Sequence, residues 1–287
     1  MQPNVESFFD PVTSTFSYII YRGPGTACAV IDPVRDYDDN SARTGHTLAN
    51  TIINFIQQHE LKLQWLLETH IHADHLSASS YLRERLGGKI ATSAAISKVS
   101  EIFGDIFNFT VPESDPCQHF DHLFTPDEVF YIGDMRAVAM HVPGHTQADM
   151  AFYIEDAVVF VGDTLFAPDV GTARCDFPGG SAKQLWHSIQ KLLALPQSTR
   201  TFLCHDYPPP GRGPRCEFSV GQQRADNIHM ADNISETQFV HFREQRDKQL
   251  RLPQLLVPSL QANLRAGALP PAEANGISYM KVPLNIF

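Results

Sequence analysis

Apolar residues follow two different spacings in the amino-terminal part of the chain. Two short apolar runs, 16–21 and 26–32, flank Gly23-Pro24-Gly25, and this pattern predicts a β-hairpin. Between His46 and Gln58 the apolar residues recur at helical spacing, which predicts an amphipathic helix. The polar segment 34–45 predicts a loop. The run 63–69 predicts a strand and 76–86 a helix.

The remainder of the chain shows the same two spacings. Strand-like runs occur at 89–92, 129–132, 137–142, 150–154, 158–161 and, as the last strand, 201–204. Helical patterns cover 94–103, 181–195, 219–230 and 235–250. Ser235 and Gln238 form a capping box at the start of the last of these helices. The segment 105–127 lacks periodicity and predicts a long irregular connection.

The order of these elements predicts the fold class. Strands are followed by helices, then by more strands and more helices, and the two halves resemble each other coarsely. We therefore expect an α/β fold in which two sheets pack together with helices outside. The expected organisation is a single domain over 1–287, with a Pro-rich extension from about residue 251.

Composition and charge exclude several classes of function. The chain has 287 residues, is 43% hydrophobic and carries a formal net charge of −10. This acidity argues against nucleic acid as a partner, because phosphate binding needs excess positive charge. The five cysteines form no CxxC pair, which argues against a disulfide framework or a Cys-rich zinc site. Without a signal peptide pattern or a long apolar run, the chain is expected to be cytoplasmic, with no membrane partner.

The candidate chemistry is concentrated in the histidine loop, residues 69–76, which reads Thr-His-Ile-His-Ala-Asp-His-Leu. This loop directly follows a predicted strand, and strand ends are where α/β proteins place ligands. His70 and His72 are two residues apart, so they point the same way in extended backbone. Imidazole and carboxylate groups are ligands for divalent metals. The sequence therefore predicts a metal site here.

Three further candidate ligands also follow predicted strands. His145 comes after 137–142, Asp163 after 158–161, and His205 after 201–203. If these strand ends share one edge of the sheets, seven side chains converge. The seven are His70, His72, Asp74, His75, His145, Asp163 and His205. A loop at 171–177, which contains Arg174 and Cys175, precedes the predicted helix at 181–195.

The pattern HxHxDH, then GH, then GD, then H, each at a strand end, resembles the metallo-β-lactamase superfamily from about Phe16 to about Met230. The resemblance implies an αββα sandwich of two packed mixed sheets flanked by helices. Within the superfamily, the histidine loop, His205-Asp206-Tyr207 and Arg174-Cys175-Asp176-Phe177 resemble the persulfide dioxygenases (sulfur dioxygenases, ethylmalonic encephalopathy protein-like), in a bacterial branch. Cys175 departs from the threonine of the better-known members, and its thiol is expected to be a small buried group.

The resemblance implies a non-heme Fe(II) enzyme with one iron per chain, held by His70, His145 and Asp163. It would oxidise glutathione persulfide with O2 and water to sulfite and glutathione. The other polar residues would then orient ligands or hold water. These residues are His72, Asp74, His75, His205 and Tyr207. Arg174, Arg212 and Arg215 are the expected contacts for the carboxylates of glutathione, and Met280 is expected to cover the pocket.

Other functions remain open from the sequence. A dinuclear thioester hydrolase resembling glyoxalase II would use His70, His72, His145 and Asp163 for one metal. Asp74, His75, His205 and the shared Asp163 would hold the second metal. A metal or persulfide sensor is less favoured, because no DNA-binding or signalling segment is evident. The acidic charge disfavours a nuclease, and a homodimer is an expectation from the resemblance.

Overall fold

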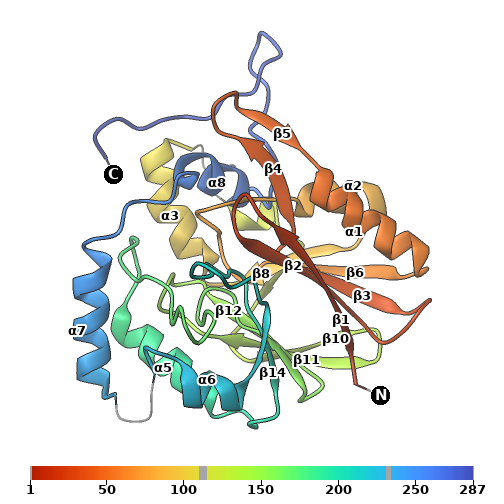
Figure 1. The fold of residues 1–287 in the computed structure, drawn as a ribbon. Coiled ribbons are helices and arrows are strands. Elements are labelled where there is room, and N and C mark those ends of the chain that lie inside the picture. Colours follow the sequence, from red (N-terminus) through yellow and green to blue (C-terminus); the bar gives the residue numbers. More distant parts are fainter. Residues whose placement is uncertain (1, 110–114, 231–233, 287) are drawn as a thin grey trace.

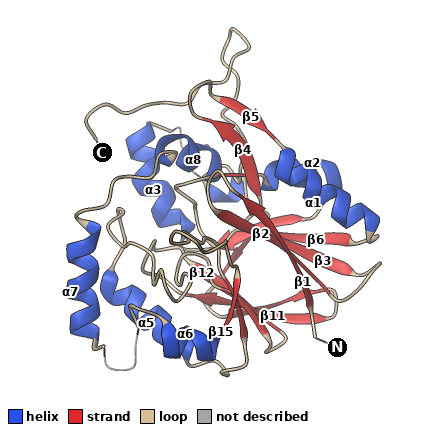
Figure 2. Cartoon of the chain, viewed as in Figure 1, coloured by secondary structure: helices blue, strands red, loops and turns tan. Residues whose placement is uncertain are grey.

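The computed structural model describes residues 2–109, 115–230 and 234–286. Two mixed sheets pack face to face, and helices cover both outer faces (Figures 1 and 2). This αββα arrangement confirms the predicted fold class.

The first sheet has the order β1-β2-β3-β6-β8-β9. Its strands are β1 (Asn4–Asp10), β2 (Thr15–Tyr21), β3 (Ala27–Ile31), β6 (Lys62–Leu67), β8 (Lys89–Ser93) and β9 (His122–Phe124). The predicted hairpin is confirmed, because β2 and β3 pair antiparallel. Strands β3, β6, β8 and β9 run parallel to one another. Their carboxyl ends therefore meet at one edge of the sheet.

The second sheet has the order β10-β11-β12-β13-β14-β15. Its strands are β10 (Glu128–Ile132), β11 (Met135–His141), β12 (Met150–Ile154), β13 (Val158–Phe160), β14 (Arg200–Phe202) and β15 (Glu217–Ser219). Its first five strands were predicted, with β14 corresponding to the run 201–204. The prediction that this run is the last strand was wrong, because β15 returns antiparallel to β14. Strands β13 and β14 are parallel, so they end at the same edge.

A small sheet, β5-β4-β7, lies beside the first one. It contains β4 (Val34–Asp38), β5 (Arg43–Gly45) and β7 (Leu76–Ser77). The prediction of a loop over 34–45 was wrong, because β4 and β5 form an antiparallel pair despite their polar sequence. The helix predicted from Leu76 begins later, because Leu76 and Ser77 pair with β4.

The helices largely follow the predictions. They are α1 (Thr47–Gln58), α2 (Ser79–Leu86), α3 (Ile96–Phe107), the 3-10 helix η1 (Pro116–Gln118), α5 (Ala182–Leu193), α6 (Val220–Asp226), α7 (Glu236–Asp247) and α8 (Leu256–Asn263). The capping box of Ser235 and Gln238 at the start of α7 is present as expected. Helix α3 begins and ends later than predicted, and α6 ends at Asp226 rather than Met230.

Two predicted irregular segments contain regular structure. The segment 105–127 includes the end of α3, η1 and β9, whereas its residues 110–114 lie outside the described residues. The extension after Arg251 includes α8, which the sequence did not predict because proline-rich composition masked its short apolar pattern. Among the residues that the structure describes, no helix is both long enough and apolar enough to cross a membrane.

The alternation of side chains along the strands builds three apolar layers. Tyr18, Ile20 and Leu67 face the interior between the sheets, where they meet Phe130 and Phe152 of the second sheet. Neighbouring residues on the same strands point outward against α1, α2, α3 and α8. The outer face of the second sheet packs against α5, α6 and α7. Continuous apolar runs in these strands therefore reflect burial on both faces.

Candidate metal centre

The strand ends expected to converge do meet at one edge of the sandwich. The histidine loop follows β6, and His145 follows β11 after the turn at Pro143-Gly144. Asp163 follows β13, and His205 follows β14, its parallel neighbour. Gly144 has a backbone φ of +153°, and a Cβ there would lie 2.3 Å from the backbone of Leu185 in α5. Glycine therefore lets the His145 turn pack directly on that helix.

One group of candidate ligands is formed by His70, His145 and Asp163. Their ligand atoms lie within 4.8 Å of one another, and all three residues are buried. The Nε2 atoms of His70 and His145 lie 3.9 and 3.7 Å from the same Asp163 oxygen, Oδ2. His145 Nδ1 donates to the carbonyl of Arg174 at 2.7 Å, so Nε2 is the nitrogen left for a metal. His70 Nδ1 lies 3.0 Å from the Thr69 hydroxyl.

A second group lies beside it and centres on Asp74. The ligand atoms of His72, Asp74, His75 and His205 also lie within 4.8 Å of one another. His75 Nδ1 donates to Asp74 Oδ1 at 3.2 Å, and the Tyr207 hydroxyl donates to Asp74 Oδ2 at 3.3 Å. His205 Nε2 lies 3.1 Å from the same Oδ2 atom.

Two buried carboxylates contact the Nε2 atom of His72. Its Nε2 lies 3.0 Å from Asp32 Oδ1 and 3.3 Å from Glu68 Oε2. Asp32 also accepts hydrogen bonds from the backbone N–H and the hydroxyl of Thr69, at 2.7 and 2.8 Å. Because Nε2 is engaged, Nδ1 is the nitrogen of His72 that remains for a ligand.

The buried side-chain atoms that lack a hydrogen-bond partner are suited to bind a metal ion. Several buried side-chain atoms have no hydrogen-bond partner in the described part of the chain. Those near the histidine loop include His72 Nδ1, His75 Nε2, His205 Nε2 and Asp163 Oδ1. Each such atom costs about 1–3 kcal/mol when left unsatisfied. Imidazole nitrogens with a carboxylate oxygen form a donor set for a divalent transition metal. Of these four atoms, Asp163 Oδ1 belongs to the group of His70, His145 and Asp163, and the other three belong to the group around Asp74.

The electrostatics keep His70 and His205 available as ligands. His72 differs, because against the effect of burial Asp32 and Glu68 raise its pKa well above its ordinary value. Burial, reinforced by the neighbouring imidazoles of His72 and His145, holds the pKa of His70 well below its ordinary value. Burial also lowers the pKa of His205 to about 4, although Asp74 opposes this. Neutral imidazole presents the lone pair that a metal needs. Burial, together with the charge of Asp74, raises the pKa of Asp163 well above its ordinary value.

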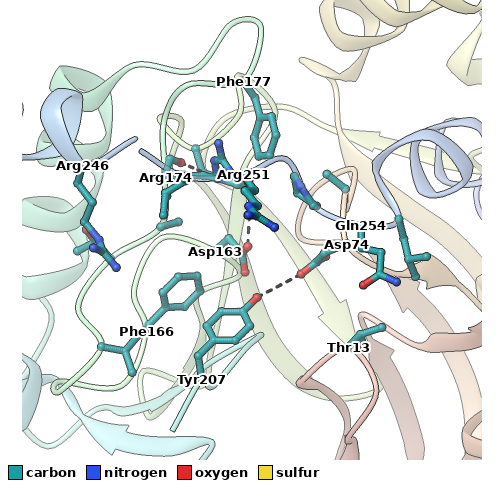
Figure 3. Close-up of a pocket in the computed structure, with 18 of the residues that line it drawn as sticks. Thr13, Asp74, Asp163, Phe166, Arg174, Phe177, Tyr207, Arg246, Arg251 and Gln254 are labelled. Atoms are coloured by element: carbon teal, nitrogen blue, oxygen red, sulfur yellow. Dashed lines mark hydrogen bonds and ion pairs between the residues drawn. The ribbon is translucent and has the colours of Figure 1, made fainter. Parts of the chain in front are cut away.

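A cavity of about 800 Å³ leads from these residues to the surface. Figure 3 shows Asp74, Asp163 and Tyr207 together in it, with Phe166 and Phe177 among the other lining side chains. Arg246 and Arg251, from α7 and the chain that follows it, also line the cavity. The site therefore combines a polar end with an apolar wall and a basic rim.

The arginines expected to bind substrate lie in different surroundings. Arg174 lines the cavity but makes two hydrogen bonds to Asp176, at 2.6 and 2.7 Å. Arg212 lies outside the lining and binds both Asp206 and Asp169 through its guanidinium. Arg215 donates its backbone N–H to Asp206 and is also outside the lining.

The remaining predicted residues also differ in whether they line the cavity. Tyr207 lines the cavity. Met280 lies outside the lining and packs beside Leu76 and Leu255. Cys175 is buried as expected, and burial raises the pKa of its thiol. None of the five cysteines forms a disulfide.

Sequence reasoning missed several residues of this region. Asp32 ends strand β3 in the way that Asp163 follows β13, so the strand-end rule could have found it. Glu68 directly follows β6, so the same rule could have found it. Arg246 and Arg251 carry no such signal, because their positions depend on packing between distant segments. Asn263 lies in α8, which was not predicted.

Comparisons with known proteins agree with this geometry. Residues 10–205 match the model of the metallo-beta-lactamase superfamily. The chain is 44% identical to glyoxylase B2 of Dictyostelium discoideum, covering 98% of this chain and 97% of that protein. It is 46% identical to a beta-lactamase hydrolase-like protein of Xylella fastidiosa, covering 99% of this chain but only 65% of the length of that relative.

Persulfide dioxygenases are among the more distant relatives. The human mitochondrial persulfide dioxygenase ETHE1 is 28% identical over 71% of this chain and 68% of its own. The crystal structure of ETHE1 from Myxococcus xanthus superposes with a TM-score of 0.73 at 26% identity, covering 92% of this chain and all of that one. The chain therefore belongs to the metallo-beta-lactamase superfamily and is related within it to the persulfide dioxygenases.

Proposed function

We propose that this protein is a persulfide dioxygenase with one Fe(II) per chain, held by His70, His145 and Asp163. It would convert glutathione persulfide, O2 and water to glutathione and sulfite. The S–S bond breaks, and the terminal sulfur gains two oxygen atoms from O2 and one from water. The relationship to persulfide dioxygenases and the cavity beside these three residues support the proposal.

The observation that carries the choice of one metal concerns Asp74. Both of its oxygens accept hydrogen bonds, from the His75 imidazole and from the Tyr207 hydroxyl. A dinuclear hydrolase would need Asp74 as a ligand of the second metal. We infer that its carboxylate instead organises His75 and Tyr207 beside the group formed by His70, His145 and Asp163, although Asp74 also belongs to the second group of candidate ligands.

The residues around the cavity have separate tasks in this proposal. Fe(II) held by two imidazoles and one carboxylate would supply redox chemistry toward O2. The aromatic rings of Phe166 and Phe177 line the cavity, where they would limit the access of water to its inner end. The Tyr207 hydroxyl, held by Asp74, can donate to or accept from a bound sulfur group.

Arg246 and Arg251 are the best candidates to bind the carboxylates of glutathione. Among the residues that the structure describes, neither guanidinium has a hydrogen-bond or ion-pair partner, whereas Arg174 and Arg243 are paired with acids. A protein of net charge −10 needs such local cations for an anionic substrate. Guanidinium suits carboxylate recognition because it can donate two parallel hydrogen bonds.

We expect Arg251→Ala to raise the KM for glutathione persulfide about tenfold while kcat changes little. The reason is that binding of a remote carboxylate is equal in the ground and transition states. Steady-state O2 uptake measures both constants. Arg136→Ala removes an exposed arginine from β11, outside the cavity lining, and should change neither. An unchanged KM in Arg251→Ala would contradict this role.

The central test measures metal content and O2 uptake together on protein purified without oxygen. With glutathione persulfide as substrate, the proposal expects about one iron per chain, O2 consumption and sulfite formation. The rival is a dinuclear thioester hydrolase, favoured by the second ligand group and by the glyoxylase B2 relative. Two metal ions per chain, no O2 uptake and hydrolysis of a glutathione thioester would support that rival and refute the dioxygenase.

Asp74→Asn separates the two functions at one residue. In the dioxygenase it should lower activity while one iron per chain is retained, because Asp74 only organises His75 and Tyr207. In a dinuclear hydrolase the same change should remove a second bound metal. Metal analysis of the purified variant beside the wild type distinguishes the two outcomes.

A further inference from the structure

Helix α8 lies outside the matched superfamily region, 10–205, yet it contacts the histidine loop. Asn263, its last residue, is buried. The Nδ2 group of Asn263 donates to the carbonyls of His72 and His75, each at 2.8 Å. Its Oδ1 accepts the backbone N–H of Ser77 at 2.7 Å. One side chain from the carboxyl-terminal part of the chain thus holds three backbone groups in and beside the loop.

These contacts use the full donor capacity of the amide. A side-chain amide offers two N–H donors and one carbonyl acceptor. Both N–H donors bind carbonyls of the histidine loop, and the carbonyl oxygen accepts the backbone N–H of Ser77, the residue after the loop. Without Asn263 these buried backbone groups would lose their partner, at about 1–3 kcal/mol each.

The chain after Asn263 packs against the same end of the loop. Ala266 accepts the backbone N–H of Ser80 at 3.1 Å. Gly267 has a φ of +82°, and a Cβ there would lie only 2.4 Å from the carbonyl oxygen of Ser77. The two backbones therefore approach as closely as glycine permits.

Glu68 fixes the loop from within. It directly precedes the loop, and its Oε1 accepts hydrogen bonds from the hydroxyls of Ser77 and Ser79, which follow it. This closes the two ends of the loop on each other. The carbonyls between these ends are the ones that Asn263 binds, so the loop is held at its ends by Glu68 and between them by Asn263.

We propose that Asn263 is a positioning residue for the metal centre. By holding the carbonyls of His72 and His75, it sets the backbone from which the imidazoles of the histidine loop project. Helix α8 is then a structural part of the metal centre. This inference rests on the metal-binding part of the proposed function and is the same for one metal ion or two.

The chain offers a matched control on the same helix. Gln261 is also buried, and its amide also makes three hydrogen bonds to backbone groups. It donates to the carbonyls of Val257 and Lys281, each at 2.9 Å, and accepts the N–H of Lys281 at 2.8 Å. None of these groups belongs to the histidine loop. Gln261→Ala therefore removes an equivalent set of bonds without touching the loop.

The test compares Asn263→Ala, Gln261→Ala and wild type after loading with Co²⁺, whose visible absorption reports ligand geometry. Thermal unfolding of the metal-free proteins should show both variants destabilised. Only Asn263→Ala should release Co²⁺ to a chelator at least about tenfold faster and change the visible spectrum, as expected for residues that orient metal ligands. Equal release rates and spectra in all three proteins would overturn the proposal.

A second variant tests the same proposal in case Asn263→Ala does not fold. Gly267→Ala places a Cβ against the Ser77 carbonyl and should speed Co²⁺ release in the same way; an unchanged rate would again contradict the proposal. Persulfide-dependent O2 uptake is measured on iron-loaded wild type in parallel. Absence of O2 uptake with normal Co²⁺ binding would refute the dioxygenase and leave this inference intact, whereas a wild type that binds no Co²⁺ would refute the inference.

Discussion

Single histidine side chains in this protein are oriented by specific polar partners, most of them far away in the sequence. His145 is oriented by the carbonyl of Arg174, and His72 by Asp32 and Glu68. His229 follows the same rule outside the metal centre. Its Nδ1 accepts the backbone N–H of Thr172 at 3.0 Å, so the ring must be neutral with its proton on Nε2. Protonation of Nδ1 would break that bond.

The pH dependence of stability should reveal His229. Burial, with help from the Arg243 charge, lowers its pKa to about 4. The unfolded chain, with a histidine pKa of about 6.5, binds the proton first, so stability is full above pH 6.5 and falls toward pH 4. Between pH 7 and pH 5 this single group should cost about 2 kcal/mol.

Urea unfolding of the metal-free protein at pH 7 and pH 5 measures this loss. His229→Gln keeps an acceptor for the Thr172 N–H but cannot be protonated, so it should lose about 2 kcal/mol less than wild type over the same interval. The comparison cancels the other buried histidines, which are common to both proteins. Equal losses in the two proteins would show that His229 does not titrate as described.

At the scale of elements, polar side chains in the loops after strands connect one loop to another. The loop after β14 is an example, because it leads from His205 to Tyr207 and is anchored by Asp206. The buried Asp206 carboxylate is bound by two nitrogens of Arg212, at 2.6 and 2.8 Å, and by the backbone N–H of Arg215. Arg212 also binds Asp169 at 2.7 Å. These bonds connect the β14 loop to the segment after β13.

We expect Arg212→Met to destabilise the protein by about 3–5 kcal/mol, because it leaves Asp206 buried without its ion-pair partner. Arg215→Met is the matched control, since only the backbone of Arg215 reaches Asp206, and it should change stability by no more than about 0.5 kcal/mol. Urea denaturation measures both. If Arg212→Met keeps its stability but binds glutathione persulfide more weakly, Arg212 contacts substrate, as the sequence alone suggested.

At the scale of the whole molecule, distant parts of the chain meet at one edge of the sandwich. The ligand candidates come from both sheets, the rim arginines from α7 and its following segment, and the loop support from α8. Figure 1 shows these parts coloured from orange to blue around one edge of the strands. The centre therefore depends on the packing of both halves.

Metal removal should lower global stability for this reason. Buried donor atoms that lose a metal are left without partners. At a free metal concentration one hundred times Kd, binding contributes about 2.7 kcal/mol, so chelation should lower Tm by several degrees. The double variant His70→Ala, Asp163→Ala should show no dependence on chelator. A wild-type Tm that is the same with and without chelator would contradict the metal centre.

The sequence by itself determined the elements whose local pattern is strong. Apolar runs predicted most strands of both sheets, because strands buried on both faces are apolar throughout. Helical spacing and capping residues predicted α1, α5 and α7. The histidine loop, His145, Asp163 and His205 could be singled out because each polar group interrupts an apolar pattern at a strand end. The fold class followed from the order of the elements, and the superfamily from the resemblance of these motifs to a known family.

Only the tertiary structure decided which residues act on one another. Strands β4 and β5 are polar and form through pairing, which local sequence does not encode. Arg212 and Arg174 pair with nearby acids, whereas Arg246 and Arg251 line the cavity without a partner. Asn263 and Glu68 hold the histidine loop through contacts across the fold and within the loop. Local patterns report burial along the chain, but the partner of a polar side chain is set by the packing of segments far apart in sequence.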